Sequence, residues 1–183
     1  MDNNKEIFLV LRAQTGDASA FDELFKDVQA PFYGYIKHMV GNPQVAEDIL
    51  QEVFLIVYRK IKWLDDPKLF RPWCYRIASR QCFKHLKTES RRGSYQIEED
   101  ELNAIAQPTA APEYDPEIAA RLPSLLERLS PESRSAIALH YLSEFSLRET
   151  AEILNVSTGT AKSRVAYGLK LLRKLLEREV RHK

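Results

Sequence analysis

The sequence predicts an all-α protein in which two small helical domains are joined by an acidic linker. Outside residues 94–117, apolar side chains recur at the three- and four-residue spacing of amphipathic helices, and no segment alternates apolar and polar residues as a half-buried strand does. Inside that range Pro108, Pro112 and Pro116 prevent a helix, and large apolar residues are scarce. We therefore expect domains at residues 1–93 and 118–183, with residues 94–117 as the linker.

Length and composition set the broad class of the protein. A chain of 183 residues with 44% hydrophobic and 29% charged residues is typical of soluble globular proteins. It lacks an apolar run of roughly 18 residues, as a membrane span requires, and it does not begin like a signal peptide. Cys74 and Cys82 are too few for a disulfide framework, so we expect buried thiols. The glycines form no phosphate-binding motif, and we expect a cytoplasmic protein with no metal and no cofactor.

The net charge of +1 conceals strong segregation of charge along the chain. Residues 94–117 hold seven acidic and no basic residues, whereas both flanking segments are basic overall. Basic residues concentrate in Phe70–Arg92 and in Lys162–Lys183. Two cationic regions fit a polyanion that is contacted at two places, although solvated helix faces would give the same composition.

Each domain is expected to contain several helices whose boundaries are marked by local signals. In the N-terminal domain we expect two helices that meet near Gly16 and Asp17, and the second of them ends at Gly41-Asn42-Pro43. A helix over 45–61 follows. After a loop bracketed by Pro67 and Pro72, a last helix runs from Trp73 to about Glu89. The C-terminal helices are expected at about 117–129, 131–142, 146–154 and 158–179.

The helix over 45–61 carries two stripes of side chains. One is apolar and faces the core, as in any amphipathic helix. The other places acidic and amide groups around one leucine at positions i, i+3, i+4 and i+7: Asp48, Gln51, Glu52 and Leu55. This composition is typical of a docking face for a basic partner helix. A solvated acidic face with one stray leucine is the open alternative.

The helix that follows Pro72 mixes aromatic and basic residues. Single-stranded nucleic acid binds such faces, because bases stack on rings while phosphates pair with cations. Trp73 and Tyr75, near the start of the helix, are expected to be partly exposed. The alternative is that the rings simply belong to the core.

Residues at about 146–166 predict a helix-turn-helix. Ser146 and Glu149 form a capping box that opens a short helix. A tight turn at Asn155-Val156-Ser157 follows, and Ser157 can cap a longer second helix with small, polar and basic residues near its start. In a helix-turn-helix, this second helix enters the major groove of DNA. A plain helical hairpin is the alternative.

Four segments resemble motifs of the bacterial extracytoplasmic-function RNA polymerase sigma factors of the sigma-70 family. Residues 46–54 (AEDILQEVF) resemble AEDhhQEhF, residues 73–78 (WCYRIA) resemble WLYRIA, residues 129–134 (LSPESR) resemble the LP-x-x-x-R opening of the second domain, and residues 159–164 (GTAKSR) resemble GTVKSR. The resemblance covers nearly the whole chain, with the motifs in the expected order.

The resemblance implies a protein without catalytic activity that binds core RNA polymerase and directs promoter-specific initiation. It implies that Asp48, Gln51, Glu52 and Leu55 dock on the coiled coil of the polymerase clamp. It implies that the fourth helix and the loop before it open and capture the −10 element, through Trp73, Tyr75, Arg76, Ser79, Arg80 and Lys84. It implies duplex recognition of the −35 element by Ser157, Thr158, Gly159, Thr160, Lys162, Ser163, Arg164, Ala166 and Tyr167. The implied partners are core polymerase, promoter DNA and an anti-sigma factor, with no small-molecule substrate and no membrane insertion.

The chain departs from the family pattern at two places. Arg80 stands where the family often has an asparagine, so the amide that would contact a flipped −10 base is absent and the resemblance does not assign the preferred −10 base. Residues 166–169 (AYGL) replace a cluster of arginines, so fewer phosphate contacts and an altered −35 preference are expected.

Two other classes of function remain open at this point. A free-standing helix-turn-helix regulator would explain the C-terminal domain but would leave the 48–55 face and the aromatic-basic helix unused. An enzyme is disfavoured, because the four histidines are scattered and no nucleophile motif is present: His38, His85, His140 and His182.

Overall fold

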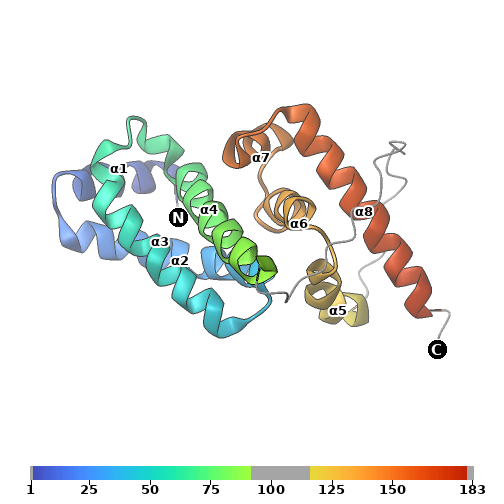
Figure 1. The fold of residues 1–183 in the computed structure, drawn as a ribbon. Coiled ribbons are helices and arrows are strands. Elements are labelled where there is room, and N and C mark those ends of the chain that lie inside the picture. Colours follow the sequence, from blue (N-terminus) through green and yellow to red (C-terminus); the bar gives the residue numbers. More distant parts are fainter. Residues whose placement is uncertain (1, 92–115, 181–183) are drawn as a thin grey trace.

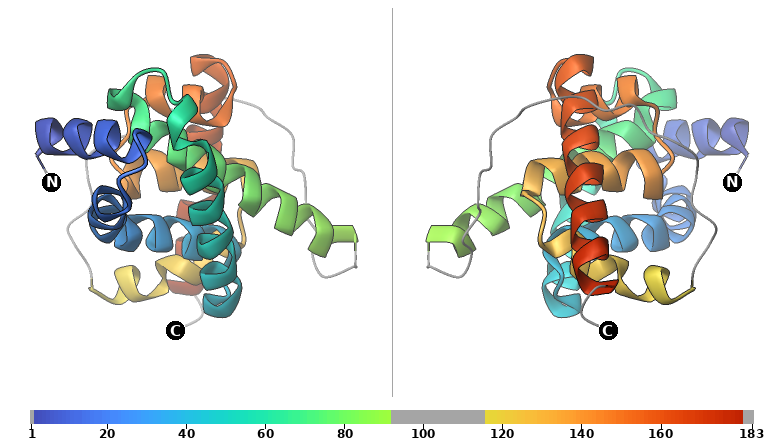
Figure 2. Two further views of the ribbon diagram at one scale, coloured as in Figure 1. Left: turned by 90° about the vertical axis from the view of Figure 1, so that its left-hand side faces the viewer. Right: turned by 90° about the vertical axis from the view of Figure 1, so that its right-hand side faces the viewer.

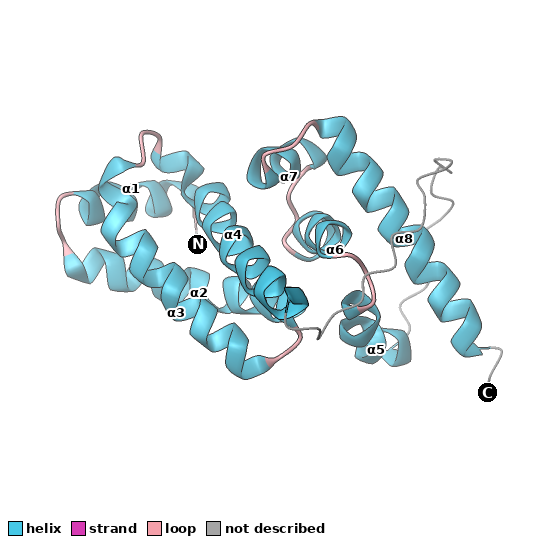
Figure 3. Cartoon of the chain, in the orientation of Figure 1, coloured by secondary structure: helices cyan, strands magenta, loops and turns pink. Residues whose placement is uncertain are grey.

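The computed structural model describes residues 2–91 and 116–180, so most of the predicted linker at 94–117 lies outside the described residues. Within those two ranges the chain forms helices and loops and no strand (Figure 3). The helices of the N-terminal range gather on one side of Figure 1 and those of the C-terminal range on the other, with α4 between them. The predicted all-α fold is confirmed.

The N-terminal range contains four α-helices and two short 3-10 turns. Their bounds are α1 (Asn3–Gln14), α2 (Ala18–Val40), α3 (Pro43–Lys60), η1 (Ile61–Trp63), η2 (Pro67–Leu69) and α4 (Phe70–Arg91). The predicted start of the fourth helix after Pro72 is wrong, because α4 begins at Phe70 and contains this proline. Proline is tolerated there, since the first-turn N–H groups of a helix have no intrahelical acceptor.

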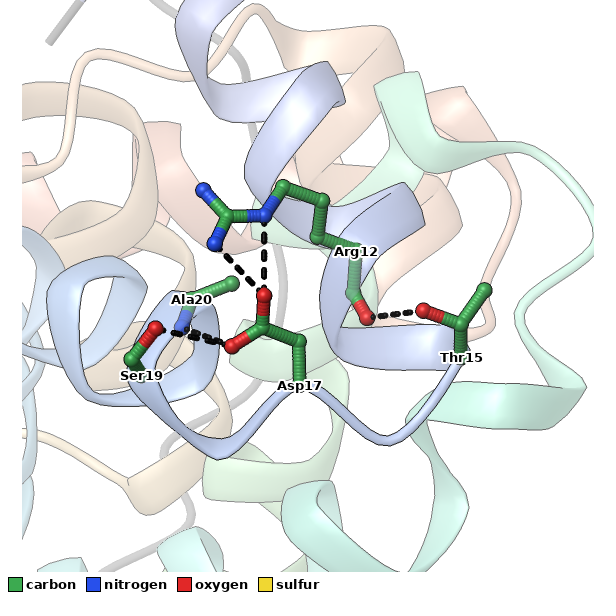
Figure 4. Close-up of polar contacts among 5 residues, drawn as sticks. All are labelled: Arg12, Thr15, Asp17, Ser19 and Ala20. Atoms are coloured by element: carbon green, nitrogen blue, oxygen red, sulfur yellow. Dashed lines mark hydrogen bonds and ion pairs between the residues drawn. The ribbon is translucent and has the colours of Figure 1, made fainter.

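The junction between α1 and α2 is fixed by Asp17 (Figure 4). Its carboxylate accepts hydrogen bonds from the Ala20 N–H at 3.0 Å, from the Ser19 hydroxyl at 2.8 Å and from Arg12 Nε at 2.9 Å. The hydrogen bond from the Ala20 N–H contributes most to lowering the pKa of Asp17 to about 2, followed by those from Ser19 and Arg12. Asp17 therefore caps α2 as an anion and ties it to the end of α1.

The C-terminal range begins with a helix packed against α2 and ends with a long helix. Its elements are α5 (Pro116–Glu127), α6 (Pro131–Ile137), η3 (Ala138–Leu142), α7 (Leu147–Leu154) and α8 (Thr158–Val180). The predicted helix over 131–142 is present, but its last turn is a π-helix in which the Ser143 N–H donates to the Ala138 carbonyl at 2.9 Å. No helix within residues 2–91 and 116–180 is long and apolar enough to cross a membrane.

The largest buried cluster draws side chains from both ranges of the chain. It is built mainly from α1 to α4, and Ala138, Leu139 and Ile153 of the C-terminal range belong to it. A second, smaller cluster joins α5, α6 and α8 through leucines and Ile137. The two predicted domains are therefore packed on each other, while the C-terminal end of α4 extends away from the other helices (Figure 2).

Candidate polymerase and nucleic-acid interfaces

The polar stripe of α3 lies on the surface. Asp48, Gln51 and Glu52 are exposed, and Leu55 exposes 54% of its surface. The opposite face of the helix is anchored by Val53 and other fully buried residues. Leu55 is thus an exposed apolar side chain framed by acidic and amide groups.

The stripe on α3 adjoins the basic side of α4. Asp48 and Glu52 line a shallow groove together with Lys84 and His85 of α4. Two residues of the predicted polymerase-binding stripe and one predicted −10 residue, Lys84, thus line the same groove. Sequence periodicity placed each group on its own helix, but only the packing of α3 on α4 brings them together.

The six predicted −10 residues are divided between surface and interior. Arg80 and Lys84 are exposed, whereas Trp73 and Arg76 are half-buried. Tyr75 and Ser79 are buried, with 4% and 2% of their surface exposed. The expectation that Tyr75 is partly exposed is therefore wrong in this arrangement.

Tyr75 is buried because aromatic rings from both domains surround it. Its ring lies 4.6 Å from Phe32, 5.3 Å from Tyr35 and 4.9 Å from Phe145, measured between centroids. All three pairs are edge-to-face, the geometry that aromatic quadrupoles prefer. Burial raises the pKa of the Tyr75 hydroxyl.

Ser79 belongs to a buried hydrogen-bond chain. The Tyr35 hydroxyl lies 2.7 Å from Ser79 Oγ and 2.8 Å from Ser135 Oγ, and Ser79 Oγ donates to the Tyr75 carbonyl at 2.8 Å. Burial raises the pKa of Tyr35 well above its usual value. The hydroxyl therefore stays protonated and links α2, α4 and α6.

The loop before α4 presents an aromatic side chain that sequence reasoning did not single out. Trp63 exposes 64% of its surface, and Lys62 Nζ lies 4.5 Å from its ring centroid. Gln14 Nε2 holds the turn by donating to the carbonyls of Ile61 at 3.0 Å and Leu64 at 2.7 Å. The signal in the sequence was an aromatic residue beside lysine in a short polar loop.

The turn between α7 and α8 has the predicted geometry. Ser146 Oγ accepts from the Glu149 N–H, and Glu149 Oε2 accepts from the Ser146 N–H, which completes the capping box. Asn155 ends α7 in the left-handed conformation, with φ of 54°, and Ser157 Oγ accepts from the Thr160 N–H at 3.0 Å to start α8. The left-handed Asn155 thus ends α7 on one side of the turn, and the Ser157 cap starts α8 on the other side.

The predicted −35 residues gather on the outer side of α8. Ala161 and Val165 are buried and hold the helix against the domain. The exposed members are Ser157, Thr158, Gly159, Thr160 and Lys162, and the half-buried members are Ser163, Arg164, Ala166 and Tyr167. Small side chains near the start of the helix permit close approach to a base edge, and Lys162 supplies a cation there.

Arg134, the last residue of the LSPESR segment, is fully buried. Its Nη1 donates to the Met39 carbonyl at 2.6 Å, and its Nη2 donates to the Leu129 carbonyl at 3.1 Å and to the Glu127 carbonyl. The guanidinium therefore joins the end of α2 to the turn between α5 and α6. The three carbonyls offset part of the cost of burying this charge, while the buried Nε has no hydrogen-bond partner.

Cys74 and Cys82 are free and buried, as expected. Burial raises the pKa of the Cys74 thiol well above its usual value and raises that of Cys82 to about 12. Among the described residues no group of three or more histidine, cysteine, aspartate or glutamate side chains could hold a metal ion.

Both the N-terminal and the C-terminal range of the chain match a known protein family. Residues 10–92 match the model of sigma-70 region 2, and residues 119–172 match that of sigma-70 region 4. The chain is 30% identical to the RNA polymerase sigma factor CarQ of Myxococcus xanthus over 165 residues, covering 90% of this chain and 94% of that protein. It is 29% identical to the ECF RNA polymerase sigma factor SigW of Bacillus subtilis (strain 168) over 179 residues, covering 91% of this chain and 94% of SigW.

The fold also resembles that of a solved complex. In the structure of the sigma factor RpoE bound to the anti-sigma factor NepR from Bartonella quintana, a chain 22% identical to this one superposes with a TM-score of 0.68. The match covers 86% of this chain and 96% of that chain.

Proposed function

The chain belongs to the sigma-70 family of RNA polymerase sigma factors, in its extracytoplasmic-function group, and we propose how its surfaces divide the work of initiation. It binds core RNA polymerase and directs initiation at promoters through −35 and −10 elements. The N-terminal helices serve the −10 element and polymerase, and the C-terminal helices serve the −35 element. Residues 1–93 and 118–183 are the two functional domains, and residues 94–117 connect them.

The polymerase docks on the polar stripe of α3. Asp48, Gln51 and Glu52 offer acceptors to a basic helix, and Leu55 offers the apolar contact at the centre. The binding surface is the coiled coil of the polymerase clamp. Because the stripe is exposed, this docking requires no rearrangement within the N-terminal domain.

The −10 element is opened and held on α4 and the loop before it. Arg80 and Lys84 are exposed cations that can pair with phosphates, and Trp73 lies near the start of the same helix. Tyr75, Arg76 and Ser79 complete the surface once they are accessible. Arg80 replaces the amide common in the family, so it offers a cation in place of an amide contact to a flipped −10 base.

The −35 element is recognised as duplex by the start of α8. The strongest support is the capped turn between α7 and α8, which exposes Ser157, Thr160 and Lys162 on one side while Ala161 and Val165 are buried on the other. Lys162 and Arg164 meet phosphate or guanine, and Ser163 can hydrogen-bond a base edge.

An anti-sigma factor regulates the protein. RpoE of Bartonella quintana, which shares the fold, was solved in complex with the anti-sigma factor NepR. We infer a comparable partner for this chain. We also infer that the protein has no catalytic activity, uses no metal or cofactor and acts in the cytoplasm, where bacterial core polymerase works.

Run-off transcription from a promoter library tests the function. Bacterial core polymerase is assayed with and without this protein, and transcripts that appear only on addition are mapped. Shared motifs near −35 and −10 are expected. Absence of such transcripts, together with failure to co-elute with polymerase and tight duplex binding by the protein alone, would instead favour a free-standing regulator.

A band-shift panel tests the altered −35 preference. Duplexes carrying the −35 sequences of characterised relatives are compared with the motif found by run-off transcription. We expect weaker binding to the relatives' sequences, because the AYGL segment at 166–169 replaces their arginines. Equal binding to all sequences would contradict the expectation.

A further inference from the structure

We propose that the C-terminal half of α8 carries a second DNA contact, a stripe of cationic side chains that binds backbone phosphates beside the −35 element. The stripe consists of Lys170, Arg173 and Lys174, and is called the distal stripe below. The proposal rests on the proposed role of the start of α8 in −35 recognition. It adds a contact that is independent of base sequence and whose ligand is duplex DNA.

The distal stripe lies on the same side of α8 as the predicted −35 residues. Its three side chains are exposed. At 3.6 residues per turn they share an arc of about 120° with Lys162 and Ser163. Figures 1 and 2 place α8 at the outer edge of the C-terminal range, and no other described helix covers the outer side of its C-terminal half. The −35 side of α8 therefore continues into the distal stripe.

The opposite side of the same turns holds the stripe in place. Leu172 and Leu175 expose 7% and 4% of their surface and belong to a buried cluster with Leu125 and Leu126 of α5. Thr158–Val180 is one α-helix. The distance of the distal stripe from the start of α8 is therefore set by helix geometry.

The cations of the distal stripe have no acidic partner. On α7, Arg148 Nε lies 3.2 Å from a carboxylate oxygen of Glu152, four residues later. Glu177 stands at the same spacing from Arg173, yet no ion pair within residues 2–91 and 116–180 joins it to the stripe. Neighbouring cations without counter-charges produce a positive potential that attracts a polyanion. Glu177 reverses the sign of the surface and marks the end of the stripe.

The reach of the helix indicates which part of DNA the stripe meets. The axial rise from Lys162 to Lys170 is about 12 Å, which equals the width of the major groove, about 12 Å. When Lys162 lies in the groove, Lys170 and the residues beyond it therefore lie at or outside the edge of the groove. Base edges are accessible only inside the groove, whereas phosphates line its edges. The distal stripe thus contacts phosphates.

This contact also accounts for the composition of the middle of α8. Residues 166–169 (AYGL) contain no cation, so the groove-facing turns contribute little to phosphate binding. The distal stripe supplies three cations one turn later. Each phosphate that a cation neutralises releases counterions and adds about 0.9 to the slope of log affinity against log salt. Three contacts therefore account for a slope of about 2 to 3.

The salt dependence of duplex binding by the full chain tests the proposal. The probe is a fluorescein-labelled duplex that carries the −35 motif found by run-off transcription and extends one helical turn beyond it on each side. Affinity is measured by anisotropy between about 50 and 200 mM salt. Lys170→Gln/Arg173→Gln/Lys174→Gln should reduce the slope by about 2 to 3 and weaken binding at least about tenfold near 100 mM salt.

A charge-matched variant controls for the loss of net charge. Lys5→Gln/Lys26→Gln/Lys37→Gln removes three exposed cations from α1 and α2 and should leave the slope unchanged. Equal slopes for the wild type and the distal-stripe variant, or equal losses in the two triple variants, would refute the proposal. An unchanged slope together with weaker co-elution with core polymerase would assign the stripe to a protein contact instead, and would equally refute it.

Uncharged linkages in the probe test which phosphates are bound. Methylphosphonates replace the phosphates of one flank of the −35 motif at a time. On one of the two flanks the replacement should weaken binding of the wild type and leave the affinity of the distal-stripe variant unchanged. Lys162→Ala should retain this flank effect. Equal effects of both flanks on the wild type and the distal-stripe variant would contradict the assignment.

Glu177→Lys tests the proposal with the opposite sign and keeps it decidable if the triple variant fails to fold. It extends the stripe by one cation and should steepen the slope by about 0.9; an unchanged slope would count against the proposal. A wild-type chain without preference for the motif over a scrambled duplex would refute the proposed −35 role. The slopes of the variants on both duplexes would still decide the distal stripe, because its contact does not depend on sequence.

Discussion

Gly168 lies where α8 packs closely on α6, and its replacement by alanine should weaken the packing that holds the −35 helix. A Cβ at this position would lie 2.5 Å from Ile137 Cδ1 and 3.3 Å from Ser133 Cβ. The first distance is far below ordinary carbon–carbon contact, so Ile137 must move. Ser133 Cβ belongs to a buried residue near the start of α6 and has little freedom to follow.

The expected magnitude follows from two opposing effects. Overpacking a well-packed site typically costs about 1–3 kcal/mol. Alanine is more favourable than glycine inside a helix by about 1 kcal/mol. Gly168→Ala should therefore lower the free energy of unfolding by up to about 2 kcal/mol. For a chain of this size each kcal/mol corresponds to a decrease in Tm of about 2–4 °C.

Ile137→Val tests the cause, because it removes the Cδ1 atom that the new methyl group would meet. Alone it should cost about 0.5–1.5 kcal/mol. In Gly168→Ala/Ile137→Val the methyl group introduced on α8 occupies the vacated space, so the double variant should be more stable than the sum of the single effects by at least about 0.5 kcal/mol. Urea unfolding followed by circular dichroism measures all four proteins. Additive effects, or a Gly168→Ala variant more stable than the wild type, would show that the close contact does not exist.

Three further predictions concern the proposed surfaces and one helix cap. Glu52→Arg should reverse the charge at the docking stripe and weaken co-elution with core polymerase. Gln44→Arg, at an exposed position near the start of α3, serves as its control. Equal losses of co-elution in the two variants would point to a nonspecific effect of charge. Lys162→Ala should weaken −35 duplex binding by about 1–3 kcal/mol if it contacts a base, or reduce the salt slope by about one if it contacts phosphate. Unchanged affinity and slope in fluorescence anisotropy would remove Lys162 from the interface. Asp17 has its pKa lowered to about 2 in the folded chain, so its stabilising contribution is complete above about pH 4 and is lost as the pH falls towards 2. Asp17→Asn should therefore lose less stability than the wild type between pH 4 and pH 2, and parallel acid-unfolding curves would contradict this.

Local chemistry made much of the fold predictable. Gly41 ends α2 with φ of 75°, and the capping box at Ser146 and Glu149 starts α7, where the sequence placed them. Such signals act within one or two turns of a helix, so the residues alone specify them. The start of α4 was predicted too late, because the sequence alone does not distinguish a proline in the first turn of a helix, such as Pro72, from a proline in a loop.

The features that the sequence could not predict depend on contacts between distant segments. Tyr75 was expected to be partly exposed because it lies near the start of its helix, but Phe145, 70 positions later, covers it. The sequence assigned Arg134 to a motif, but it could not predict that the guanidinium donates to the Met39 carbonyl in the other domain. Periodicity assigns a residue to one face of its own helix and does not state what that face meets.

The shared buried cluster has a consequence for protein engineering. Sigma factors invite modular design, in which the C-terminal domain of one protein is exchanged for that of another to create a new −35 preference. In this chain Ser135 and Phe145 are fitted to Tyr35 and Tyr75 of the other domain, so a transplanted domain without them would recognise its own DNA but leave apolar surface uncovered. Such hybrids should be less soluble, unless the contacts between domains are transplanted as well.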